Sequence, residues 1–120
     1  MKFLLMIHGD EREWSALTDQ ERETTKQQYA AFAQSQRESG TLLHSGHLQP
    51  TDRATTVRVR DGETLVTDGP YTETKEALGG YFLLEADSLD EVVDLVRGLP
   101  VPATTSGIEI RAVYEEGRAS

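Results

Sequence analysis

The sequence predicts an α+β fold of the ferredoxin-like type, built in the order βαβ, hairpin, βαβ. Three observations lead to this prediction: two helix-like segments that each lie between strand-like segments, and one Asp-Gly pair between two alternating runs. The 120 residues suit one compact domain, which we expect over residues 1–115, with a frayed tail at 116–120.

One face of the predicted sheet is expected to lack a cover within the chain. In this fold the helices pack on one face of the antiparallel sheet, and the other face stays open. An exposed apolar face of that size usually contacts a partner, most simply a second copy of the chain. The apolar share of only 37% points the same way, because a thin core gains from burial against a second subunit. We therefore expect a homodimer in which two sheets face each other.

The first βαβ unit begins with an alternating apolar run at residues 2–8, which is typical of a buried strand. Thr18 followed three residues later by Glu21 has the spacing of a capping box, in which two side chains satisfy orphan backbone donors of a helix. Gly40 is well placed to end that helix. A second strand is predicted at residues 42–48.

Residues 54–67 predict a β-hairpin. Two alternating runs flank Asp61-Gly62, and an Asp-Gly pair in this setting is the strongest local signal for a two-residue type I′ turn. Such a turn fixes the pairing register, so that Thr55 lies opposite Asp68. Asp68 is then expected on the same side of the ribbon as the valines.

The second βαβ unit begins with the apolar run at residues 80–86, which is typical of a central strand. Ser88 and Glu91 have the spacing of a second capping box. The helix that follows is expected to be closed by Gly98 and Pro100. Alternation at residues 108–114 predicts the last strand.

The composition excludes several classes of function. A formal net charge of −9 and a pI near 4.7 argue against nucleic acid and anionic membranes as partners, because both attract Lys and Arg. The absence of cysteine excludes disulfides and thiolate chemistry. No apolar run has the length of a membrane span, and the opening apolar run is too short for a signal peptide. We expect a cytoplasmic protein, and no local pattern calls for a metal or a cofactor.

The polar, aromatic-flanked segment at residues 68–81 is the first candidate for a functional site, because binding and catalysis often lie on such loops. Asp68 is the candidate acid or base, and His47 and His8 are its candidate partners. In the structural alternatives Asp68 shapes the turn through backbone hydrogen bonds and each histidine is satisfied by the backbone. Alternation sends His44 and His47 to opposite faces, so they make a poor metal pair.

Three further side chains of this segment, Tyr71, Glu73 and Lys75, are candidates for ligand binding. Tyr71 would stack on a ligand or donate a hydrogen bond, and Lys75 would hold an acidic group. In the alternative, this is a solvated charged loop and Tyr71 packs across the seam of the dimer.

The motifs VTDGPY at residues 66–71 and LGGY at residues 78–81 resemble the signature of the YCII-related, or DGPF-domain, family. Tyr71 stands where the nominal motif has phenylalanine. The segment at residues 46–48 and the strand at residues 54–58 are also similar to the family's pattern, so the resemblance covers nearly the whole chain. It implies a dimeric α/β-barrel with a cleft that uses a His–Asp pair. In the wider family it also implies a link to the breakdown of halogenated aromatics, and genes that lie beside sigma factors of the extracytoplasmic-function type.

These observations lead to two functional hypotheses. In the first, a small organic molecule binds in a cleft, and Asp68 paired with His47 or His8 moves a proton in a lyase- or isomerase-like step. In the second, the protein is a non-catalytic binding or regulatory module associated with a sigma factor. The sequence leaves open whether the protein is an enzyme, and it does not specify a substrate.

Overall fold

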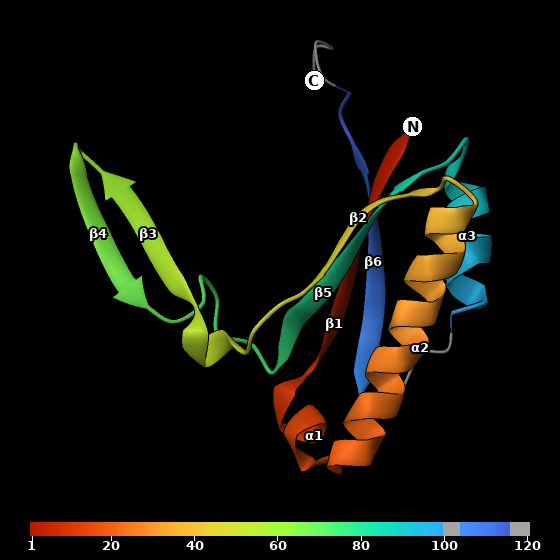
Figure 1. Cartoon of the computed structure of the whole chain (residues 1–120). Helices are drawn as coiled ribbons and strands as arrows, with labels where there is room; N and C mark the ends of the chain where they lie inside the picture. The colour runs from red at the N-terminus through yellow and green to blue at the C-terminus, as the bar shows by residue number, and fades with distance from the viewer. Residues whose placement is uncertain (100–103, 116–120) are drawn as a thin grey trace.

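The computed structural model describes residues 1–99 and 104–115 (Figure 1). Its elements follow the order β1 (Lys2–Asp10), α1 (Glu11–Ala16), α2 (Asp19–Glu38), β2 (Leu42–His47), the 3₁₀ helix η1 (Thr51–Arg53), β3 (Thr55–Arg60), β4 (Glu63–Asp68), β5 (Glu76–Glu85), α3 (Leu89–Arg97) and β6 (Thr105–Val113). This order confirms the predicted α+β class. The expected end of the second helix is confirmed, since α3 ends at Arg97 with Gly98 as its C-cap. Pro100 itself and the expected tail at 116–120 lie outside the described ranges.

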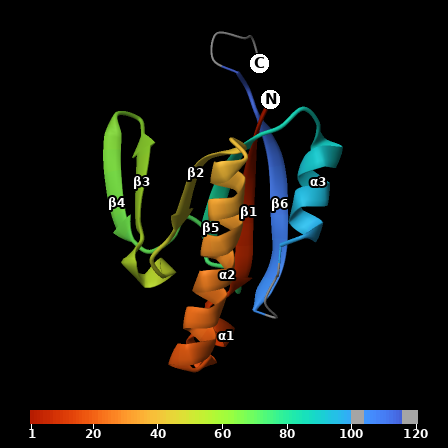
Figure 2. The same ribbon diagram turned by 45° about the vertical axis from the view of Figure 1, so that its right-hand side comes forward.

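Four strands form one sheet in the order β2-β5-β1-β6, and every neighbouring pair in it is antiparallel. The long helix α2 and the helix α3 both cover the same face of this sheet (Figures 1 and 2). The arrangement agrees with the predicted ferredoxin-like fold. No helix in the described parts of the chain covers the other face, and none there is long and apolar enough to cross a membrane.

The core lies between the sheet and the two covering helices. Strand alternation directs Phe3 and Leu5 of β1 toward the helices, together with Phe82 and Leu84 of β5, and all four are buried. Phe32 of α2 meets Phe82 edge to face, with ring centroids 5.1 Å apart. Paired apolar faces of sheet and helix thus supply most of the burial that holds the fold together.

Capping side chains fix where the helices begin. The predicted capping box of Thr18 and Glu21 is confirmed, since each side chain accepts a hydrogen bond from the other residue's backbone N–H. For α3 the prediction is half right. The Ser88 hydroxyl accepts a hydrogen bond from the backbone N–H of Glu91, as predicted. The Glu91 carboxylate, however, accepts from the backbone N–H of Asp87 rather than from that of Ser88.

The substitution Thr18→Ala is expected to lower the free energy of unfolding by about 1 kcal/mol, because it removes the acceptor for an otherwise orphan helix donor. Urea unfolding followed by circular dichroism measures the change. Thr24→Ala is the matched control, since Thr24 is exposed on the same helix and alanine favours helix there. An equal loss in both variants would show that the cap contributes nothing specific.

The hairpin of β3 and β4 is a separate two-stranded sheet that projects away from the main sheet (Figure 1). Positive φ angles of 51° at Asp61 and 80° at Gly62 fit the predicted type I′ turn. The register is also as predicted, with Thr55 opposite Asp68. Apolar side chains on this ribbon are more than half exposed, including Val59 at 68%.

Two features differ from the sequence prediction. First, β1 continues to Asp10 and is followed by the helix α1, which was not predicted. The side chain of Asp10 accepts a hydrogen bond from the backbone N–H of Arg12 and so caps this helix. Second, β5 begins at Glu76 rather than at residue 80, because residues 76–78 pair with β1 beyond a bulge. The loop expected at residues 68–81 therefore shrinks to 69–75.

Candidate functional site

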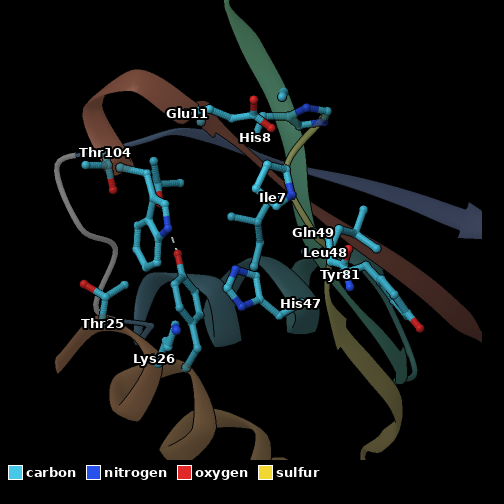
Figure 3. Close-up of a pocket in the computed structure, with 18 of the residues that line it drawn as sticks. Ile7, His8, Glu11, Thr25, Lys26, His47, Leu48, Gln49, Tyr81 and Thr104 are labelled. Atoms are coloured by element: carbon cyan, nitrogen blue, oxygen red, sulfur yellow. Dashed lines mark hydrogen bonds between the residues drawn. The ribbon is translucent and has the colours of Figure 1, made fainter. Parts of the chain in front are cut away.

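An open cavity of about 1320 Å³ lies between one end of the sheet and the helices α1 and α2 (Figure 3). Its walls come from β1, α1, α2, β2, β5, the segment from β2 into η1, and the start of β6. A volume of this size accommodates a small organic molecule. We therefore take this cavity as the candidate site.

The cavity exists because a glycine lies between two larger residues of the sheet. In the register of the strands, Gly80 of β5 is the neighbour of Ile7 on β1 and of His47 on β2. A Cβ atom built at Gly80 would lie 3.9 Å from both Ile7 Cδ1 and His47 Cα, and only 3.0 Å from the carbonyl oxygen of Gly46. The missing side chain leaves a hollow in the sheet surface.

His47 projects into this hollow from the end of β2 (Figure 3). The ring of Trp14 meets it edge on, with ring centroids 6.0 Å apart. Burial lowers the pKa of His47 below its usual 6.5, and the positive charge of Lys26 lowers it further. At neutral pH the ring is consequently uncharged and able to accept a proton.

Aromatic side chains form much of the remaining wall. Tyr29 of α2 lies beside Phe82, with ring centroids 6.2 Å apart. The Tyr29 hydroxyl lies 3.1 Å from Oγ1 of Thr105 in β6, and burial raises the pKa of this phenol. With Trp14 these rings offer flat apolar surfaces to a ligand.

Two carboxylates of the cavity are engaged by the protein itself. Asp10 is buried and accepts from the backbone N–H of Arg12 at 2.9 Å, which is the main cause of its lowered pKa. The Arg12 guanidinium lies 3.4 Å from its other oxygen. Glu11 accepts from the backbone N–H and the hydroxyl of Thr51 at 2.8 and 2.7 Å. These bonds tie α1 to the segment after β2 and so hold one wall in place.

Comparison with known proteins assigns the family. The family model for the YCII-related domain matches residues 1–116. The chain belongs to the YCII-related family. A relative from Rhizobium meliloti (strain 1021), described as an uncharacterized protein, is 37% identical over 120 residues, which cover 98% of this chain and 97% of the relative. The match includes every wall of the cavity, so the candidate site lies inside the YCII-related domain.

His8, the second candidate histidine, also lines the cavity of this YCII-related protein, but its ring does not point toward that of His47 (Figure 3). Its Nε2 atom lies 3.5 Å from Oε1 of Glu109 on the adjacent strand β6. The predicted separation of the other two histidines is confirmed. His44 lies on the opposite sheet face from His47, where its Nδ1 is 2.8 Å from the hydroxyl of Tyr81.

The candidates from the segment after β4 lie elsewhere. Asp68, Tyr71, Glu73 and Lys75 are all exposed, and none of them lines the cavity in the described part of the chain. Tyr71 lies under the guanidinium of Arg58, whose Cζ is 5.1 Å from the ring centroid. The ligand-binding roles of these residues stay predictions, with no support from the geometry of one chain.

Neither role considered for the Asp68 side chain is visible in the described residues. Its carboxylate makes no hydrogen bond or ion pair within residues 1–99 and 104–115, whether to a histidine or to the backbone of the turn. The backbone of Gly69 makes the hydrogen bonds of this turn. Its N–H donates to the carbonyl oxygen of Ala54, and its carbonyl oxygen accepts from the hydroxyl of Thr56. The pairing of Asp68 with His47 or His8 stays a prediction.

Sequence reasoning missed four residues of the site: Asp10, Trp14, Lys26 and Tyr29 as a wall residue. A signal existed for the first of them. Asp10 followed three residues later by Glu13 has the same capping spacing as Thr18 and Glu21, and it would have predicted α1. With α1 in place, Trp14 would have been recognised as a side chain held beside the end of the sheet.

Proposed function

We propose that this YCII-related protein binds a small organic molecule in the cavity and that His47 transfers a proton to or from it. The observation that carries the proposal is the position of the His47 ring, which faces an aromatic-walled hollow large enough for a ligand. Burial, which lowers the pKa of this ring, supports the same role. A positioned imidazole of this kind contributes about 10²–10⁴-fold to the rate of a proton transfer. The reaction would be lyase- or isomerase-like, because such steps begin with removal of a proton.

We further propose the homodimer expected from the sequence, arranged as a dimeric α/β-barrel. Its support is the open face of the main sheet together with the exposed valines of the projecting hairpin. Asp68 lies on the valine side of this ribbon, so a contact that covers the valines would also cover its carboxylate. The predicted pairing with a histidine would form in that setting.

Occupancy of the cavity is tested with N-phenyl-1-naphthylamine, an uncharged aromatic dye that fluoresces when it is removed from water. Ala30→Phe is expected to weaken dye binding by about tenfold or more, because a phenyl ring fills space where Ala30 lines the cavity. The matched control is Ala31→Phe, at the next position of α2, which is also exposed but does not line the cavity. Equal binding by the two variants would refute the proposed site.

The proton-transfer role is tested with His47→Gln in a turnover screen of small organic acids, ketones and lactones. The turnover rate of the His47→Gln variant is expected to fall by about a hundredfold or more, while the variant still binds the dye. Because the pKa of His47 lies below 6.5, the rate should rise with pH through that lowered value and level off by neutral pH. Nuclear magnetic resonance of the imidazole protons gives this pKa independently. Absence of turnover, with co-purification of a sigma factor, would favour the regulatory alternative instead.

A further inference from the structure

Among the residues that the structure describes, one basic side chain of the cavity, Lys26, has no counter-ion. Of the cavity's two basic side chains, Arg12 is paired with Asp10, whereas Lys26 makes no ion pair or hydrogen bond within the described ranges. Lys26 is exposed to solvent on a helix that lines the cavity, so its ammonium group is available to pair with an anion bound there.

Helical spacing directs Lys26 toward the cavity. Lys26, Tyr29, Ala30 and Ala33 follow the i, i+3, i+4, i+7 pattern of one helix face, and all four line the cavity. Figure 3 shows the Lys26 side chain among those that line the cavity, on the helix wall that faces the sheet strand of His47. The two alanines leave room beside the lysine, so the ammonium group can reach a ligand that rests on the Tyr29 ring.

Resting on the proposed function, we propose that the ligand carries one negative group on a flat apolar body. Lys26 binds the anion, and the rings of Trp14 and Tyr29 contact the body. The anion would be a carboxylate, sulfonate or similar group, since the shared feature is a negative charge with several acceptor oxygens.

The electrostatics of the cavity support this assignment. Asp10 and Glu11 already accept hydrogen bonds from the protein, so neither is free to neutralise Lys26. Asp52 is an exposed carboxylate at the η1 edge of the cavity and makes no ion pair with Lys26. The charge of Lys26 also disfavours protonation of His47. A bound anion would neutralise Lys26 and would thereby remove its effect on the His47 ring.

Two dyes with the same aromatic body separate the role of charge from that of shape. 8-Anilino-1-naphthalenesulfonate is N-phenyl-1-naphthylamine with an added sulfonate. We expect the anionic dye to bind about tenfold more tightly than the neutral dye, because a hydrogen bond between charged groups is added. Lys26→Gln should remove this preference and leave binding of the neutral dye unchanged.

Lys2→Gln, on an exposed residue at the start of β1, is the control and is expected to keep the preference for the anion. Lys75→Gln, in the exposed loop after β4, tests the rival assignment in which Lys75 holds the acidic group, and we expect this variant to keep the preference as well. Equal affinity of wild-type protein for the two dyes, or loss of the preference in Lys75→Gln but not in Lys26→Gln, would overturn the inference. If Ala30→Phe still weakens binding of the neutral dye in that case, the proposed function survives. If Ala30→Phe changes the binding of neither dye, both proposals fail.

Discussion

Leu84→Ala is expected to lower the free energy of unfolding by about 2–5 kcal/mol. Leu84 is completely buried on the central strand β5, where it pairs with Phe3 on one side and Leu42 on the other. Removing its branched side chain loses the favourable burial and also leaves a cavity, because backbone on both sides prevents collapse. Since domains of this kind are stable by only about 5–15 kcal/mol, the loss is a large share of the total.

Urea unfolding, compared at one protein concentration, measures this loss. The matched control is Leu89→Ala, because Leu89 is 52% exposed at the start of α3 and should cost less than about 1 kcal/mol. If Leu84→Ala is no more destabilising than Leu89→Ala, the helices do not pack on the sheet as described. A variant that fails to fold at all would agree with the upper end of the expected range.

The parts of the fold that were predicted correctly depend on local signals. Thr18 and Glu21 interact across one helical turn, and Asp61-Gly62 sets the register of strands that it joins directly. In such cases the chemistry that decides the structure lies within a few residues of sequence. The family resemblance drawn from the motifs at residues 66–71 and 78–81 is confirmed as well.

The site was predicted less well because it depends on strand pairing between distant segments. Ile7, His47 and Gly80 become neighbours only when β1, β2 and β5 join in one sheet. His47 could be chosen from its type and its adjacent glycine, but nothing local indicates that Gly80 leaves space beside it. The polar and aromatic composition instead predicted a functional site that included the loop at residues 69–75, where Tyr71, Glu73 and Lys75 are exposed.

The same limit applies to Lys26. Read along α2, it is one of many charged residues on a helix whose apolar stripe is narrow, and such residues usually face water. Only the position of α2 over the glycine-lined end of the sheet turns this face of the helix into a cavity wall. Charge patterning therefore predicts only a solvated helix surface, whereas the proposed binding role of Lys26 depends on how distant segments pack together.

Val66→Lys is expected to convert the proposed homodimer into a monomer. Val57, Val59 and Val66 share one side of the projecting ribbon and are 57%, 68% and 60% exposed. A two-stranded hairpin alone is at best marginally stable in water, so a ribbon with this much exposed valine needs a contact outside its own chain. A lysine at its centre would place an unpaired charge in that contact, and burying such a charge costs several kcal/mol.

Sedimentation at low micromolar concentration tests this expectation, with wild-type protein predicted at twice the 13.3 kDa of one chain. The adjacent Leu65→Lys is the matched control, since Leu65 is 58% exposed but points to the opposite side of the same strand. The contact buries the valine side only if Val66→Lys dissociates the dimer and Leu65→Lys does not. A monomeric wild-type protein would refute the homodimer and, with it, any setting in which Asp68 is covered by a second copy. Equal dissociation by both lysines would mean that both sides of the ribbon are buried. The position of Asp68 on the valine side would then no longer distinguish it from the residues on the opposite side.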